Sequence, residues 1–278
     1  MSDWSQNLAV RVGSALVLFP AAVWLTWKGG LAFTLLCAAA AAVAAAELVL
    51  MFERRPGPAE VLGIVVAGLH SVGVWAAWRA GGSLVPEWLA LALAGAFLLL
   101  LALVLFRPGP VEAAPRAAAI VTFAWLYCGL LVSSVVALRL RFGFGWVILV
   151  FVVTWANDTL AYFAGRAFGR HKLFERISPK KTWEGFAGGA VGSVAGAFAV
   201  KALLLPAVPA WACWAMAAGG AVLGPVGDLA ESLVKRGAGV KDSGRLIPGH
   251  GGLLDRIDAL LFVAPWIYGF AVLLERLG

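Results

Sequence analysis

The sequence has little charge for its length. Of its 278 residues, 13% are Asp, Glu, Lys or Arg, whereas 62% are hydrophobic. A soluble monomer needs a polar exterior, so this composition excludes an ordinary water-soluble enzyme. Cysteine is also scarce. The three cysteines lie inside apolar runs and none stands at a disulfide or metal spacing, which argues against disulfide bonds and zinc.

Long apolar runs make up most of the chain, and its mean hydropathy is +0.90. Many of these runs approach or exceed the roughly 20 residues that cross a bilayer. The predicted spans are 12–27, 31–52, 60–78, 88–106, 117–138, 146–168, 184–205, 208–233 and 257–277. The sequence therefore predicts an all-α, polytopic membrane helical bundle of about nine transmembrane helices.

Lys and Arg are unevenly distributed among the predicted loops. If the N-terminus is cytoplasmic, most of the 22 Lys and Arg residues fall on the cytoplasmic side. The positive-inside rule then places the two most polar loops, 166–183 and 234–256, at the cytoplasmic face. The net charge of +7 suits loops that face anionic headgroups, and it does not call for a nucleic-acid partner.

Ionisable side chains within the apolar runs concentrate in the C-terminal half. The first five predicted helices contain few such groups, and we interpret Glu47 among them as interfacial. A charged side chain at membrane depth costs roughly 2.5–3.5 kcal/mol on insertion scales, so the C-terminal charges need a reason to be there. We therefore divide the chain into N-terminal transmembrane helices, residues 1–140, and a C-terminal catalytic region, residues 141–278.

The strongest functional pattern is the segment 228–258. It opens with a polar stripe at helical spacing, formed by Asp228, Glu231, Ser232 and Lys235. A basic, glycine-rich loop follows, and Asp255 and Asp258 come after it, three residues apart. Glycine amides and basic side chains bind phosphate, whereas carboxylates next to phosphate select Mg²⁺. An ordinary positive loop explains the basic residues, but not the carboxylates beside apolar helices.

A second pattern is the stretch 178–185, Ser-Pro-Lys-Lys-Thr-Trp-Glu-Gly. We expect Ser178 and Pro179 to be the N-cap and first residue of the seventh helix. A helix N-terminus beside Lys180 and Lys181 is a favourable anion site. Ordinary capping with interfacial Lys and Trp anchors is the alternative.

A third pattern is Asn157-Asp158 in the sixth predicted helix, with Tyr162 one turn later. This pattern is consistent with a helix that faces a polar cavity. The alternative is an interhelical hydrogen bond that only fixes the packing.

The segment 228–258 resembles the signature of the phosphatidate cytidylyltransferases, also called CDP-diacylglycerol synthases. The signature positions present here are Ser232, Lys235, Arg236, Lys241, Asp242, Pro248, His250, Gly251, Gly252, Asp255, Arg256 and Asp258. The stretches 157–162 and 178–185 also resemble elements of this family. The first five helices carry no motif that can be matched, so there the resemblance is only architectural.

The resemblance implies transfer of a cytidylyl group from CTP to phosphatidic acid, giving CDP-diacylglycerol and pyrophosphate. This is a reaction of phospholipid biosynthesis, expected at the cytoplasmic face of a bacterial inner membrane. The implied catalytic residues are Asp228, Lys235, Arg236, Asp255 and Asp258. The implied substrate-binding residues are Asn157, Asp158, Lys180, Lys181, Thr182, Glu184, Glu231, Ser232, Lys241, Asp242, His250, Gly251, Gly252 and Arg256. Asp228 and Asp255 are the implied Mg²⁺ ligands, and a second cation and a homodimer are left open.

Two other functions are compatible with the residues alone. A CTP-dependent lipid alcohol kinase also handles CTP and a lipid, but moves the γ-phosphate. A transporter also places charges such as Asp158 and Asp228 at membrane depth, although the chain has no repeat symmetry and its charges gather towards one face.

Overall fold

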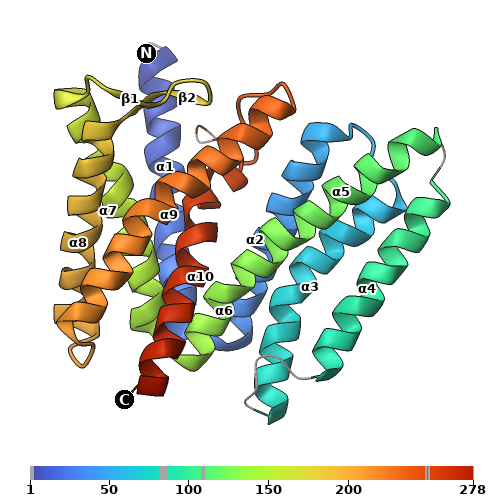
Figure 1. Ribbon diagram of the computed structural model, residues 1–278, viewed down its shortest axis with the longest axis horizontal. Helices are drawn as coiled ribbons and strands as arrows, with labels where there is room; N and C mark the ends of the chain where they lie inside the picture. The colour runs from blue at the N-terminus through green and yellow to red at the C-terminus, as the bar shows by residue number, and fades with distance from the viewer. Residues whose placement is uncertain (1–2, 82–86, 108–109, 248, 250, 278) are drawn as a thin grey trace. The chain divides into compact units, whose positions relative to one another are not determined.

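The computed structural model describes residues 3–81, 87–107, 110–247, 249 and 251–277, which are almost entirely helical (Figure 1). The first four helices are α1 (Asp3–Lys28), α2 (Gly30–Phe52), α3 (Pro58–Gly81) and α4 (Glu87–Leu105). A continuous helical segment follows, made of η1 (Val111–Ala113), α5 (Ala114–Ala124), η2 (Trp125–Leu130) and α6 (Leu131–Arg141). The last helices are α7 (Phe144–Phe168), α8 (Trp183–Leu204), α9 (Ala210–Gly237) and α10 (Leu254–Leu277).

Four helices thus precede the continuous segment and four follow it, so the described residues form the nine helical segments that the sequence predicts. Seven segments are long and apolar enough to span a membrane, and α4 adds the shorter apolar stretch Ala90–Leu105. Many large apolar side chains on these helices are exposed, as expected where lipid is the solvent. The prediction of a polytopic all-α membrane protein is therefore confirmed.

The chain divides into two compact units. The N-terminal unit comprises Met1–Leu140 together with Asp242–Arg256, and the C-terminal unit comprises Arg141–Lys241 together with Ile257–Gly278. Most of the basic loop and the first turn of α10 therefore pack with the N-terminal helices. The polar stripe of α9 belongs to the other unit.

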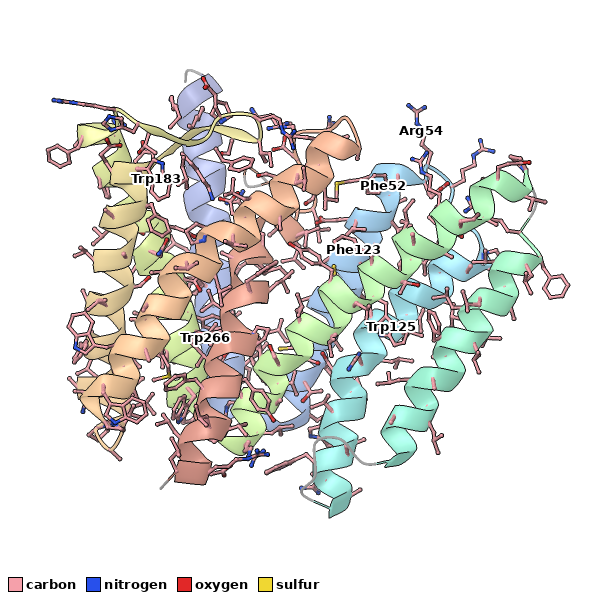
Figure 2. The ribbon with its side chains drawn as sticks, in the orientation of Figure 1. Phe52, Arg54, Phe123, Trp125, Trp183 and Trp266 are labelled. Atoms are coloured by element: carbon pink, nitrogen blue, oxygen red, sulfur yellow. The ribbon has the colours of Figure 1, made fainter. Side chains whose placement is uncertain are left out.

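Small residues and one bulge shape the core of the N-terminal unit. Ala41, Ala44 and Ala45 of α2 are fully buried, so neighbouring backbones approach closely. The π-helical turn η2 carries Trp125, which Figure 2 labels, and its indole Nε1 donates to Nδ1 of His70 at 3.3 Å. This hydrogen bond satisfies two buried polar rings within the apolar core.

The C-terminal unit is organised around close packing of α7 on α8. One face of α8 carries a glycine stripe, which consists of Gly185, Gly188, Gly189, Gly192 and Gly196. A Cβ atom on Gly192 would lie 2.3 Å from the carbonyl oxygen of Ala156 on α7, and one on Gly189 would lie 2.9 Å from Oδ1 of Asn157. The two backbones are therefore almost in contact, as glycine-rich membrane helices permit.

A short hairpin joins the C-terminal end of α7 to the N-terminal end of α8 (Figure 1). Its strands, β1 (Lys172–Phe174) and β2 (Ser178–Thr182), pair antiparallel. The prediction that Ser178 and Pro179 begin a helix is therefore wrong. Thr182 is the N-cap, and its hydroxyl accepts from the amide of Gly185 at 3.1 Å. The β pairing extends the backbone through Thr182 and delays the helix by four residues.

Candidate active site

A pocket of about 440 Å³ opens in the C-terminal unit between α7, the hairpin, the start of α8 and α9. Its walls contain residues from all three sequence patterns. The predicted site residues that line it are Asn157, Asp158, Lys180, Lys181, Thr182 and Asp228. Segments up to seventy residues apart in the sequence thus contribute to one polar pocket, which is the arrangement that a binding site needs.

The centre of the pocket is an ion pair between Lys181 of β2 and Asp228 of α9. The Lys181 ammonium lies 2.8 Å from Oδ2 of Asp228 and donates to the carbonyl oxygen of Pro225 at 3.3 Å. The other carboxylate oxygen of Asp228 accepts from the hydroxyl of Ser232 at 3.2 Å. Both charged side chains remain partly exposed, 23% for Lys181 and 38% for Asp228, so a ligand can reach them.

Asn157 and Asp158 have different surroundings on α7. Asn157 is 1% exposed, and its amide donates to the hydroxyl of Ser193 on α8 at 2.9 Å. The packing interpretation therefore describes the main contact of Asn157, although this residue also lines the pocket. Asp158 is exposed and lines the same pocket, so it supplies an accessible carboxylate beside Asp228.

The polar stripe of α9 contains a second, buried pair. Lys235 donates to Oε2 of Glu231 at 2.5 Å, and these side chains are 11% and 1% exposed. Glu231 and Lys235 were predicted as substrate-binding and catalytic residues. Because this ion pair is buried, it has few alternative partners. It therefore holds the two charges in a fixed position on α9, the helix that also carries Asp228. Direct contact with a substrate stays a prediction for both.

Close contact between α9 and α10 brings a further carboxylate near Asp228. A Cβ atom on Gly227 would lie 2.7 Å from the carbonyl oxygen of Asp258. The Asp258 side chain is partly buried and is close enough to experience the charges of Asp158, Asp228 and Lys235. Asp258 therefore joins the predicted cluster within the C-terminal unit.

Glu184 orders the chain next to the pocket. Its carboxylate accepts from the backbone amide of Arg170 at 3.1 Å and contacts Nδ1 of His171 at 2.6 Å. These bonds tie the start of α8 to the turn that follows α7. Trp183, labelled in Figure 2, is exposed at the same helix start. Glu184 thus positions the wall of the pocket, and its role in binding substrate stays a prediction.

Asp255 organises the loop segment, the part of the basic loop at Asp242–Arg256 that belongs to the N-terminal unit. Its Oδ2 accepts from the amide and hydroxyl of Ser243, both at 3.0 Å, and from the amide of Gly252 at 2.9 Å. Gly251 has φ +86°, a conformation that favours glycine, and a Cβ there would lie 3.0 Å from the same oxygen. The loop is therefore folded around this carboxylate.

The remaining predicted residues are exposed or lie outside the described part. Arg236, Lys241, Asp242 and Arg256 are exposed, and Arg236 donates to the carbonyl oxygen of Val240 at 3.2 Å. His250 and Pro248 lie outside the described residues. Because Asp228 and Asp255 fall in different units, their shared metal ion also stays a prediction.

Sequence reasoning named Tyr162 but missed Arg166 as a pocket residue, and it misjudged Glu47. Tyr162 and Arg166 line the pocket, and the Arg166 guanidinium donates to the Tyr162 hydroxyl at 2.9 Å. Tyr162 lies one turn and Arg166 two turns after Asp158 on the same helix, and this spacing was the available signal for Arg166. Glu47, interpreted as interfacial, is 8% exposed and contacts the loop segment.

The donor set of the pocket fits Mg²⁺. Asp158, Asp228 and Asn157 offer oxygen ligands, and the Lys181 ammonium shows that a cation is accommodated next to Asp228. Among the described residues, no three His, Cys, Asp or Glu side chains are grouped to hold a metal by themselves.

The fold and the pocket together define a class: a polytopic membrane protein with a charged pocket, suited to an anionic ligand, at one end of its helices. Comparison with known proteins narrows this class. The pattern that describes the cytidylyltransferase family matches residues 9–274, and the chain belongs to this family.

Two relatives show the extent of the similarity. A phosphatidate cytidylyltransferase of Brucella abortus is 36% identical over 278 residues, which cover 96% of this chain and 94% of the relative. The phosphatidate cytidylyltransferase of Bacillus subtilis is 39% identical over 150 residues, covering 53% and 56%.

Proposed function

We propose that this protein transfers the cytidylyl group of CTP to phosphatidic acid, releasing pyrophosphate. The observation that carries the proposal is the pocket in which Asp158, Lys181 and Asp228 meet. A nucleotide and a lipid phosphate both need cationic groups, and a magnesium nucleotide also needs carboxylates. Membership of the cytidylyltransferase family and the names of the relatives support the same reaction.

The reaction requires positioning and charge neutralisation rather than a strong base. A phosphate oxygen of the lipid is already ionised near neutral pH, and it attacks the α-phosphorus of CTP. The bond from that phosphorus to the bridging oxygen breaks, and pyrophosphate leaves with the electron pair. Lys180, Lys181 and Arg166 line the pocket and supply the positive charge that this transfer needs.

The proposed cofactor is Mg²⁺, held by Asp228 with Asp255 as the second predicted ligand. When bound, the ion would neutralise phosphate charge and orient the triphosphate. The chain's own residues prepare the site: Ser232 orients Asp228, and Lys181 balances its charge until substrates arrive.

The position of the radiolabel in the products tests the reaction. Purified protein in mixed micelles is given phosphatidic acid, Mg²⁺ and CTP labelled on either the α- or the γ-phosphate. We expect the α-label in a lipid product that contains cytidine, and the γ-label in pyrophosphate. Transfer of the γ-label to a lipid would identify a kinase instead, and absence of any labelled product would reject both enzyme activities.

We also propose that the hairpin and the basic loop face the cytoplasm across the bacterial inner membrane, because both are rich in Lys and Arg. Glu175 and Arg245 are exposed in these segments, whereas the three native cysteines are buried and can be replaced. Glu175→Cys and Arg245→Cys should resist an impermeant maleimide in intact cells. Ala207→Cys, exposed in the turn between α8 and α9, is the matched control and should react.

A further inference from the structure

A single side chain of α2 contacts the loop segment at several points. Glu47 is 8% exposed and lies five residues before the end of α2. Its Oε1 accepts from the amide of Leu253 at 3.0 Å, and its Oε2 accepts from the amide of Leu254 at 2.8 Å. Oε2 also accepts from the hydroxyl of Ser243 at 3.0 Å. All of these residues belong to the N-terminal unit.

These bonds explain how a carboxylate is tolerated within an apolar helix. Leu253 and Leu254 stand at the start of α10, where the first amides of a helix have no partner within the helix. A carboxylate there accepts charge-assisted hydrogen bonds and interacts favourably with the helix dipole. Glu47 therefore caps α10 from a different helix, although the sequence contains no local capping signal for it.

The glycines of the loop are shaped to this carboxylate. A Cβ atom on Gly244 would lie 2.5 Å from Oε1 of Glu47, and one on Gly252 would lie 2.6 Å from Oε2. Real Cβ atoms do not approach oxygen so closely, so side chains at both positions would displace the carboxylate or the loop. Glycine at positions 244 and 252 therefore leaves room for the Glu47 carboxylate.

The hydroxyl of Ser243 links Glu47 to the predicted metal ligand. It lies 3.0 Å from Oε2 of Glu47 and 3.0 Å from Oδ2 of Asp255. A hydroxyl has one hydrogen, so it can serve one of the two carboxylates fully at a time. Backbone amides donate the other hydrogen bonds: those of Ser243 and Gly252 to Asp255, and that of Leu253 to Glu47. Together these bonds fix the position of one carboxylate relative to the other.

We propose that Glu47 is a positioning residue for the cytidylyl transfer: from α2 it holds Ser243, Leu253 and Leu254 and, through Ser243, orients Asp255. This inference rests on the proposed function. It also gives the N-terminal helices a role in the chemistry, because α2 carries the carboxylate that Ser243, Leu253 and Leu254 bind.

The test compares Glu47→Gln with a matched buried carboxylate of the same unit. Glu60→Gln is the control, because Glu60 is 1% exposed, pairs with Arg107 at 2.9 Å and caps the amide of Gly57. Both variants and the wild type are assayed for kcat, for the KM of CTP, for melting temperature and for tryptic cleavage after Arg245, which is exposed in the loop.

We expect Glu47→Gln to lower kcat at least tenfold and to accelerate cleavage after Arg245, because the amide nitrogen of Gln offers donors where the loop amides need an acceptor. Glu60→Gln should lower the melting temperature and leave kcat and loop cleavage within about twofold of wild type. Glu47→Asp, which keeps the charge on a shorter stem, should retain part of kcat.

An unchanged kcat in Glu47→Gln, with loss of stability alone, would overturn the proposal. So would equal losses of kcat in Glu47→Gln and Glu60→Gln. If Glu47→Gln does not fold, Ser243→Ala decides, since it removes only the shared hydroxyl: reduced kcat with normal melting supports the link, and normal kcat rejects it. The wild type is assayed first, so failure of the proposed function appears as a missing product before any variant is compared.

Discussion

The two units place their acidic side chains in different surroundings. In the N-terminal unit, Glu47 and Glu60 are 8% and 1% exposed, and each is bound by backbone amides or by arginine. In the C-terminal unit, Asp228 is 38% exposed and faces a pocket with Lys181. Because buried charges with fixed partners stabilise one arrangement, Glu47 and Glu60 act as scaffold residues, whereas the accessible charges of Asp228 and Lys181 can exchange partners for a substrate. The buried pair Glu231–Lys235 shows that the C-terminal unit also contains a fixed ion pair beside its accessible charges.

The largest expected effect is at Asp228. Asp228→Asn keeps the shape but removes the charge, so we expect kcat to fall at least a hundredfold, equivalent to about 2.7 kcal/mol in the barrier. Chelation of divalent ions should abolish wild-type activity, and added Mg²⁺ should restore it. Turnover is measured against Mg²⁺ concentration.

Glu275→Gln is the control for Asp228→Asn, because Glu275 pairs with Arg141 near the C-terminal end of α10 and does not line the pocket. It should leave kcat near wild type. Near-normal turnover of Asp228→Asn at limiting Mg²⁺ would remove Asp228 from the proposed ligands and would erase the contrast between the units.

The next largest effect is on stability and concerns the scaffold. Arg107→Met leaves Glu60 buried without its guanidinium partner; because Arg107 is itself 21% exposed, the free energy of unfolding should fall by about 2 kcal/mol, while kcat stays unchanged. Thermal unfolding in detergent measures the loss. Arg54→Met is the control, since Arg54 is exposed and points away from the helices in Figure 2. A large loss of kcat at constant stability would show that this cluster also takes part in the chemistry.

The smallest effect is expected at Lys181. Lys181→Met removes one pocket cation while other basic residues remain, so the KM for CTP should rise about tenfold, or about 1.4 kcal/mol. Initial rates over a range of CTP concentrations measure it. Lys201→Met, on the opposite end of α8, should be silent because Lys201 bonds only the carbonyl oxygen of Pro206 among the contacts described. Equal KM values for both variants would exclude Lys181 from CTP binding.

The helices could be predicted from the sequence because most of the apolar runs are long enough to span a bilayer. Local rules were less reliable where a distant contact decides the structure. Ser178 satisfies the rules for an N-cap, yet antiparallel pairing with β1 moves the cap to Thr182. Glu47 gave no signal because its partner Leu253 lies 206 residues away. The pairing of Lys181 with Asp228 likewise depends on how α9 packs against the hairpin. The spacing of these residues in the sequence gives no information about that packing.

The glycine stripe of α8 also determines which parts of the pocket can move. The backbones at Gly192 and Ala156 leave no room for a side chain between them, so close packing opposes relative sliding of α7 and α8. A change in the shape of the pocket during turnover therefore has to come from the hairpin 172–182 or from α9. Because Lys180 and Lys181 stand on the hairpin, any movement of it would carry two pocket cations and change the charge that a bound phosphate meets.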